Sequence, residues 1–408
     1  MAEKFSRFRD AGTGIQVFLN PVPPASSASS FSYVLLPFSL VFGALRSLLI
    51  ALFAGIWALA NLGAPLGRGN AFFARAILAL FGFYSIREEK ISLRSRGRAT
   101  SASSSIVFAP GKGDIIVANS TSWTDLLYLA ARFAPVFVLP IVSASSRPPS
   151  GASSSATSTP GGATTPRRGT PKKNAMSANT RIETPGAEQA TTEIRDVKGF
   201  RRAGLWEMIR RTGYTPLVEG SKDAGTPLRL DQIAESAEAP VVVFPELVTS
   251  NNRGLLRFST VFPASWRLVY RRSGALQIGA GQSNLYLLSF KHDPPSNLLS
   301  TTTLSVPTHL GPASSGSADE TGWNPLRHMW SLVCTLPVPR ALTVRLLDPS
   351  ESPTGRQYVA DPASVNVDVL DPLADACAGL VANLSRLRRT NLGWEDKEAF
   401  LALMRSRR

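Results

Sequence analysis

Apolar residues are most concentrated between Phe31 and Leu62, a stretch that carries one charged side chain, that of Arg46. About 20 apolar residues are enough for a helix to cross a bilayer. A helix of a soluble domain would normally show a polar face, which this stretch lacks. The pattern predicts a membrane anchor, either one tilted helix or, because Pro37 and Gly43 interrupt the stretch, a re-entrant helical hairpin.

A second apolar stretch, from Ala71 to Ile86, is shorter and contains Arg75. It predicts an interfacial helix or a helix packed against the folded domain. Basic residues occur on both sides of the anchor, at 4–9 and at 68–87. Because positive flanks tend to stay on the cytosolic side, this distribution favours the hairpin, which also suits a lipid monolayer.

After the anchor, short β-like runs alternate with helical stretches, which predicts an α/β fold. The predicted strands are at 115–119, 240–246, 275–280, 285–290 and 342–347. The predicted helices are at 121–133, 204–213 and about 373–389, followed by a helix-friendly tail that ends at 408.

A Ser/Thr/Pro/Gly/Ala-rich insertion at 143–193 interrupts this pattern and lacks the large apolar residues that would offset the entropy of ordering it. We expect it to be disordered, with a solvated basic cluster at 167–173. The chain then divides into a polar segment (1–30), the anchor with its interfacial helix (31–90), and one folded domain in two parts (91–142 and 194–408) around the insertion.

The formal net charge of +15 suits nucleic acid, an anionic membrane surface or a phosphorylated substrate. The chain has no recognition motif and no basic stripe with interleaved aromatic residues, so we expect no nucleic-acid partner. The two cysteines, Cys334 and Cys377, are far apart and outside any CxxC pattern. This argues against a zinc site and against a disulfide-rich secreted fold.

The sequence NSTSWTD, from Asn119 to Asp125, follows a predicted strand and opens an apolar helix. It sets an acid in the first turn, after residues suited to capping. On its own, it indicates a helix N-terminus. A second segment, VVVFPELVTSNNRGLLRF from Val241 to Phe258, sets a strand directly before Phe-Pro-Glu and a polar loop.

Together, NSTSWTD, FPExxTSNxRGLLRF and the later LYLLSFKHDPP resemble motifs of the glycerolipid acyltransferase family, in which the first motif is NHxxxxD-like and the third FPEGTxS-like. More closely, they are similar to the fungal lysophosphatidic acid:oleoyl-CoA acyltransferases, as is NLGWEDKEAF at 391–400. The resemblance covers roughly 119–290 without the insertion, and 203–217 stands where the second motif would be. It implies a mixed sheet flanked by helices, with a membrane-embedded helix or helical hairpin at the N-terminus.

In such a family the motif aspartate, here Asp125, orients a catalytic base. The loop of Glu246 would bind the substrate phosphate, with Arg253 as a donor. The common family arginine falls at Thr249. The substrate-binding residues that the resemblance implies are Asn119, Phe244, Pro245, Glu246, Thr249, Ser250 and Arg253.

Ser120 stands where the family has its catalytic histidine, and a serine hydroxyl is not a base near neutral pH. A slow enzyme, a relocated base and a binding-only descendant all remain open. The chain has three histidines, His292, His309 and His328. His292 follows a predicted strand, so it is either an imidazole that reaches Asp125 across the cleft or an ordinary loop histidine.

Two other routes need no histidine. Asp125 itself, working through a water, is one candidate for removing the proton. Orientation and oxyanion donors without any base are the other.

The resemblance implies acyl transfer from acyl-CoA to a lysophospholipid, above all lysophosphatidic acid to phosphatidic acid, in phospholipid and triacylglycerol synthesis. Acyl-CoA is then a co-substrate, with no further cofactor and no metal, and membrane lipids are partners. The expected location is the endoplasmic reticulum membrane, with the lipid droplet as a second site. The alternative is a catalytically impaired acyltransferase fold that binds lipids or acts in membrane traffic.

Overall fold

The computed structural model describes residues 2–22, 30–63, 67–93, 107–144, 194–263, 266–270, 276–279, 283–296, 299–309, 324–335, 338–358 and 371–406. The expected disordered insertion at 143–193, with its basic cluster, lies outside these residues except for its first two positions.

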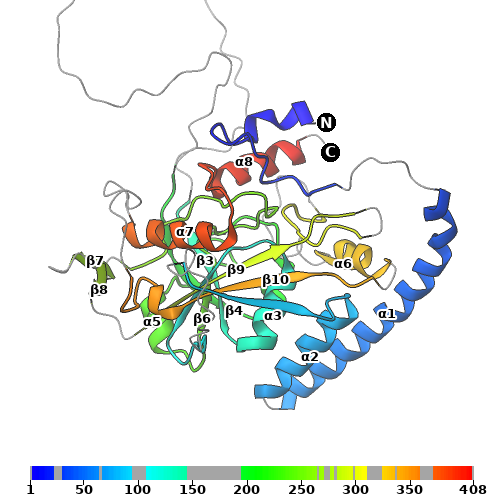
Figure 1. Ribbon diagram of the computed structural model, residues 1–408, viewed down its shortest axis with the longest axis horizontal. Helices are drawn as coiled ribbons and strands as arrows, with labels where there is room; N and C mark the ends of the chain where they lie inside the picture. The colour runs from blue at the N-terminus through cyan, green and yellow to red at the C-terminus, as the bar shows by residue number, and fades with distance from the viewer. Residues whose placement is uncertain are drawn as a thin grey trace, which may run out of the picture. The chain divides into compact units, whose positions relative to one another are not determined.

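Helices and strands alternate along most of the chain (Figure 1). The helices are η1 (Ala2–Phe8), α1 (Ser30–Gly63), α2 (Gly67–Leu80), α3 (Trp123–Phe133), α4 (Leu205–Arg210), α5 (Leu230–Glu235), α6 (Leu326–Val333), η4 (Pro349–Glu351), α7 (Pro372–Ser385) and α8 (Trp394–Arg405). The strands are β1 (Ile86–Ile91), β2 (Ile115–Ala118), β3 (Val136–Val142), β4 (Val197–Ala203), β5 (Leu217–Val218), β6 (Val241–Val243), β7 (Arg267–Tyr270), β8 (Leu276–Gly279), β9 (Leu285–His292) and β10 (Leu342–Leu347).

The main sheet has eight strands in the order β1-β10-β9-β2-β6-β3-β4, with β5 also paired to β3. The pairs β9–β2, β2–β6, β6–β3 and β3–β5 are parallel. In contrast, β10 and β4 run antiparallel to β9 and β3. The predicted α/β class and mixed sheet are therefore confirmed.

Side chains along the central strands alternate between two buried faces, as the pleat requires. Ile115 and Val117 of β2 pack in a core with α5, α7 and α8. Ile116 and Ala118 pack in a second core with α2, α3, α4 and α6. Because both faces are covered, β2 is apolar at every position rather than at every second one.

The apolar run at 31–62 forms one continuous helix, α1, so a hairpin within this run is wrong and the single helix is correct. From Pro37 to Asn61 it is long and apolar enough to cross a membrane, and little of it is buried. Arg46 is tolerated because its guanidinium donates to the hydroxyl of Tyr84 at 3.0 Å and to the carbonyl of Thr335 at 3.4 Å.

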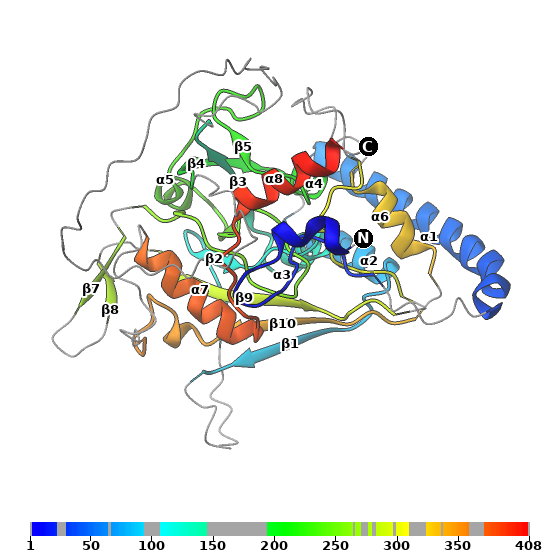
Figure 2. The ribbon, with the colours of Figure 1, turned by 90° about the horizontal axis from the view of Figure 1, so that it is seen from above.

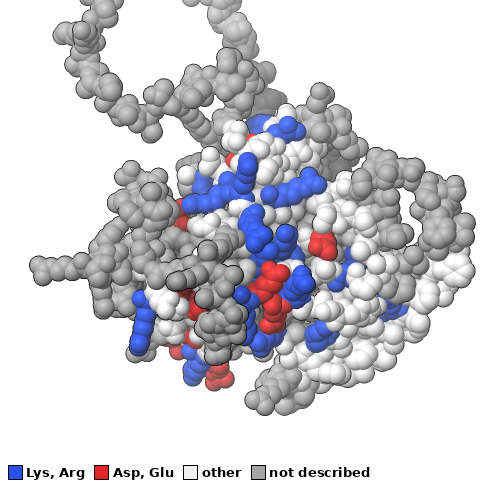
Figure 3. All heavy atoms as spheres, viewed as in Figure 1, with Lys and Arg blue, Asp and Glu red and all other residues white. Residues whose placement is uncertain are grey.

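The second apolar stretch forms α2, which packs against the domain. Ala74 and Leu78 are buried in the core that α2 shares with α3, whereas Phe72 is exposed. Arg75 donates to the carbonyl oxygens of Phe83 and Tyr84, just after the helix. Figure 3 shows that the side of the molecule formed by α1 and α2 carries few charges, whereas Lys and Arg are spread over the rest of this face.

The segment before α1 packs on the C-terminal helix. The rings of Phe5, Phe8 and Phe18 lie 5.3, 5.4 and 5.7 Å from the ring of Phe400 in α8, measured between centroids. Figure 1 and Figure 2 both show η1 beside α8. Residues before α1 and after it therefore belong to the same folded unit.

Most elements predicted from the sequence are present, including strands β2, β6, β9 and β10 and helices α3, α4, α7 and α8. The run at 275–280 is a strand, β8, but it pairs with β7 outside the main sheet. Strands β1, β3 and β4 and helices α5 and α6 were not predicted.

Candidate functional site

Three parallel strands bring the motif residues to one edge of the sheet. β2 ends at Ala118, β6 ends at Val243, and each is followed directly by a motif loop. β9 runs four residues beyond Leu288, which pairs with Ala118, and so carries His292 to the loop that follows β2. Binding sites of open α/β sheets gather at such carboxyl ends.

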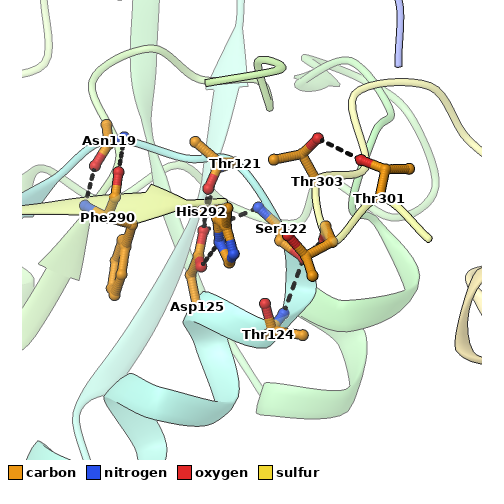
Figure 4. A network of polar contacts seen from close by, with 10 residues as sticks. Asn119, Thr121, Ser122, Thr124, Asp125, Phe290, His292, Thr301 and Thr303 are labelled. Atoms are coloured by element: carbon orange, nitrogen blue, oxygen red, sulfur yellow. Dashed lines mark hydrogen bonds and ion pairs between the residues drawn. The ribbon is translucent and has the colours of Figure 1, made fainter. Parts of the chain in front are cut away.

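His292 and Asp125 form a buried pair at this edge (Figure 4). Nε2 of His292 lies 2.7 Å from Oδ1 of Asp125, and both side chains are 1% exposed. The structure thus brings His292 to the aspartate that a relocated base would need, and the catalytic role of the pair stays a prediction.

The carboxylate of Asp125 is held by the loop and helix around it. Its Oδ2 accepts hydrogen bonds from the hydroxyl of Thr121 at 2.6 Å and from the backbone N–H groups of Thr121 and Ser122 at 3.2 and 2.9 Å. Asp125 and Ser122 also form the capping box of α3. The cap that the sequence predicted is therefore present, and the same aspartate also contacts the histidine.

A carboxylate accepts hydrogen bonds, so its contact with Nε2 of His292 favours the tautomer that carries its proton there. Nδ1 is then left with a lone pair. Nδ1 is buried and has no hydrogen-bond partner among the described residues. Leaving a buried polar atom unpaired costs about 1–3 kcal/mol, so the arrangement is expected to have a use.

Asn119 fixes the position of the histidine strand. Its side-chain oxygen accepts from the backbone N–H of Phe290 at 2.7 Å, and its side-chain nitrogen donates to the Phe290 carbonyl at 3.1 Å. The oxygen and the nitrogen of the Asn119 amide thus both bond to the backbone of Phe290, two residues before His292. In the structure Asn119 joins β2 to β9, and its role in binding substrate stays a prediction.

Glu246 ties the two motif loops together. This fully buried carboxylate accepts from the backbone N–H of Ser120 at 3.0 Å and from that of Leu256 at 3.2 Å. The carbonyl of Ser120 accepts from the N–H of Ser250 at 2.9 Å. Leu247, next in the chain, has φ 58°, in the left-handed region that favours glycine, so the turn after Glu246 is strained.

A lysine from the C-terminal helix reaches the same loop. Lys397 of α8 is fully buried, and its Nζ donates to the carbonyl of Thr249 at 2.8 Å and to its hydroxyl at 3.1 Å. Burial raises the pKa of Glu246 above its ordinary value, against the pull of the Ser120 and Leu256 amides and the charge of Lys397. Burial likewise lowers the pKa of Lys397 below its ordinary value, against the charge of Glu246, which favours the ammonium form.

Residues 299–305, called here the covering segment, cross the edge of the sheet where the two motif loops lie, which we call the motif edge. The carbonyl of Thr302 accepts from the hydroxyl of Ser122, and the N–H of Leu304 donates to the carbonyl of Thr121. The hydroxyl of Thr249 donates to the Leu304 carbonyl. The covering segment therefore bonds to both motif loops, and it also contacts the N-terminal segment through Ser305 and Asn20.

A small cavity opens beside Ser120. Residues of both motif loops line it together with residues between 208 and 217. Among them are Ser120, Ser122, Phe244, Leu247, Val248, Thr249, Met208, Arg211, Thr212, Gly213, Tyr214, Thr215, Pro216 and Leu217. Arg211 contributes a positive charge to the cavity wall, and its Nη2 lies 2.8 Å from Oδ2 of Asp223. Arg253, the phosphate donor predicted from the sequence, is exposed and does not line this cavity.

A larger apolar cavity of about 770 Å³ lies between α1 and α3. Its walls come from α1, α3, α4 and α6 and from residues near α2, among them Ile50, Ala54, Ala58, Phe81, Trp123, Leu127, Trp206 and Trp330. Trp123 and Leu127 belong to the same helix as Asp125. An apolar compartment therefore lies one helix away from the buried pair.

His328 and His309 have other surroundings. The buried ring of His328 accepts from Nε1 of Trp123 at 2.8 Å and contacts the Thr301 carbonyl through Nε2 at 3.0 Å. Burial lowers the pKa of His328 to about 4. His309 is exposed. Sequence reasoning named His328 only as one of three histidines and did not identify Arg211 or Lys397. For Lys397 the available signal was its place in NLGWEDKEAF.

The chain matches no family model, no curated protein and no solved structure.

Proposed function

We propose that this protein is a membrane-bound O-acyltransferase that moves an acyl group from acyl-CoA to the hydroxyl of a lysophospholipid, most directly lysophosphatidic acid. The observation that carries the proposal is the buried His292–Asp125 pair with Nδ1 of the imidazole left unpaired. An imidazole oriented by a carboxylate is the standard general base for activating a hydroxyl.

The pair fits each step of such a transfer. Nδ1 of His292 takes the proton as the lysolipid hydroxyl oxygen attacks the thioester carbonyl and a tetrahedral intermediate forms. The intermediate collapses by breaking the carbon–sulfur bond, and the departing thiolate of CoA takes the proton back from the imidazolium. Asp125 stabilises the imidazolium that exists between the two steps.

The apolar cavity supports a lipid-like substrate. Its walls are almost entirely hydrocarbon, and it lies between the membrane helix and the helix that carries Asp125. The cavity therefore offers an acyl chain in the membrane an apolar place to bind against α3. Arg211, at the other cavity, is a candidate for contacting a substrate phosphate, since a guanidinium matches phosphate geometry.

The packing of the N-terminal segment favours an anchor that dips into one leaflet. Phe8, Val17 and Phe18, which precede α1, are buried in the same core as α7 and α8, which follow it. Both ends of α1 then lie on one side of the bilayer, which a single crossing does not permit. The apolar exposed side chains of α1 and α2 would contact the acyl layer of that leaflet.

The function is tested with purified full-length protein, radiolabelled oleoyl-CoA and lysophosphatidic acid. We expect labelled phosphatidic acid from the wild type. The Asp125→Asn variant should lose roughly 10³–10⁴ of the rate, as happens when the orienting carboxylate of a triad is removed. Asp293→Asn, an exposed aspartate next to His292, is the matched control and should stay active. No product from the wild type would refute the proposal.

A lipid-binding role without chemistry is the second candidate, and the burial of Nδ1 beneath the polar contacts of the edge favours it. The two candidates differ in one outcome. A binding protein retains fluorescent lysophosphatidic acid on vesicles and yields no acylated product, whereas the enzyme consumes acyl-CoA with release of free CoA thiol.

A further inference from the structure

The strongest feature that the proposed reaction leaves unexplained is the buried lysine of α8. Lys397 is fully buried, although transferring a charged ammonium group from water into a protein interior is costly. It is also in the last regular helix of the chain, 148 residues from the residue that it contacts. A lysine buried in a protein core is normally paired with an opposite charge or with hydrogen-bond acceptors.

The charge of Lys397 acts on the buried carboxylate of Glu246 and favours its ionised form. The Nζ group donates twice to Thr249, three residues after Glu246, and the carboxylate of Glu246 is itself fully buried. Glu246 in turn holds the backbone N–H of Ser120. A chain of contacts thus runs from α8 through the Glu246 loop to the residues that precede Asp125.

The rest of the C-terminal segment fastens the same loop. Thr390 donates through its backbone N–H and its hydroxyl to the carbonyl of Leu255, and the N–H of Arg257 donates to the Leu392 carbonyl. Arg257 also forms an ion pair with Glu395 at 3.0 Å. These contacts set α8 against the loop, so that Lys397 enters the core at a fixed place.

We propose that Lys397 is a positioning residue for the acyl-transfer site: its ammonium group holds Thr249 and balances the buried charge of Glu246, so that the loop of Glu246 stays clamped to Ser120. This inference rests on the proposed function. Lys397 touches no substrate and moves no proton in it. Its effect on the reaction passes through the placement of the two motif loops relative to the His292–Asp125 pair.

The first test compares Lys397→Met, which keeps the length of the side chain and removes its charge, with Lys198→Met, an exposed lysine of β4. We expect Lys397→Met to lower kcat roughly 10- to 100-fold with KM changed little, since misplacing reacting groups by about an ångström has effects of that size. Lys198→Met should match the wild type. A Lys397→Met kcat within about twofold of wild type would overturn the proposal.

The second test asks whether Lys397 acts through Glu246. If it does, the Glu246→Gln/Lys397→Met double variant should be about as slow as Glu246→Gln alone. The reason is that Lys397→Met harms the site by leaving the Glu246 carboxylate uncompensated, and that carboxylate is absent once residue 246 is Gln. Losses that multiply would show that the two residues act separately and would overturn the proposal. Because Lys397→Met could fail to fold, Thr249→Val provides an independent variant that keeps the charge and removes the hydroxyl from both Lys397 and the Leu304 carbonyl.

Thr249→Val should lower kcat severalfold at unchanged KM, and an unchanged kcat would contradict the role of the contact. The proposal can fail while the enzyme assignment stands, since wild-type activity is measured separately. If the wild type makes no product, the coupling of Glu246 and Lys397 is measured by urea unfolding. The four proteins compared are the wild type, Glu246→Gln, Lys397→Met and the double variant. Additive changes in unfolding free energy would then refute the charge balance.

Discussion

Nε2 of His292 and Oδ1 of Asp125 lie 2.7 Å apart although 167 residues separate them in the chain. The parallel pairing of β2 and β9 creates this contact, because it brings the ends of both strands to one edge. Asn119 then fixes the register by bonding both ends of its amide to Phe290. An imidazole therefore reaches the motif aspartate from the neighbouring strand instead of from the motif itself.

The first prediction concerns Ser120, where the resemblance would place the histidine. The Ser120→His variant should gain no activity, because Oδ1 of Asp125 is already taken by His292 and Oδ2 by Thr121 and Ser122. The measurement is kcat/KM of the variant beside wild type. A rise of about tenfold or more, equivalent to about 1.4 kcal/mol of transition-state stabilisation, would show that Asp125 still prefers a histidine at 120.

The second prediction concerns the apolar cavity. Ala54→Phe on α1 should reduce transfer of long acyl chains more than of short ones, because a phenyl ring would occupy part of the space that a long chain needs. The ratio of rates with oleoyl-CoA and octanoyl-CoA measures this. Leu48→Phe is the control, since Leu48 is 67% exposed on the same helix and lines no part of the cavity. Equal ratios in both variants would argue against an acyl-chain site there.

The third prediction concerns stability and His328. Burial lowers its pKa from 6.5 to about 4. The unfolded chain therefore binds the proton more readily, and the contribution of His328 is fully present above pH 6.5 and is lost as the pH falls toward 4. Its size corresponds to about 3 kcal/mol.

Unfolding by urea in detergent at several pH values, for wild type and His328→Gln, isolates this contribution. The difference in unfolding free energy between the two proteins should shrink as the pH falls from 6.5 to 4. A difference that stays constant over this range would mean that His328 is not held neutral in the folded protein.

The fourth prediction concerns topology. A peptide tag before residue 2 and a second tag after 408 should both be digested when protease is added outside sealed microsomes, because the N-terminal segment packs on α8. Protection of one tag and digestion of the other would instead show that α1 crosses the bilayer.

The sequence predicted the central strands and the helix after the first motif because their local signals are strong. β2 and β6 are short apolar runs, and Ser122 and Asp125 form a standard helix start. β1 and β4 are mixed in polarity, with IREEKI in β1 and VKGFRRA in β4, so their strand character depends on pairing with β10 and β3. Of the two alternatives for 31–62, the single helix formed and the hairpin did not, and Pro37 lies inside this helix.

The site was only partly predictable for a related reason. The motif loops follow strands and can be read from the chain, whereas His292, Arg211 and Lys397 reach the edge through long-range packing. Thr249, where the resemblance would place an arginine, instead contacts the ammonium group of Lys397. Later parts of the chain thus supply an imidazole to Asp125 and an ammonium group to Thr249. No local pattern reports such a contact.

The most direct test of the account is the rate of acyl transfer from oleoyl-CoA to lysophosphatidic acid by His292→Gln, beside His309→Gln as a matched control on an exposed histidine. If His292 is the base, His292→Gln should lose roughly 10²–10⁴ of kcat, the usual share of general-base catalysis, while His309→Gln remains close to wild type. A His292→Gln variant that retains wild-type kcat would contradict the account.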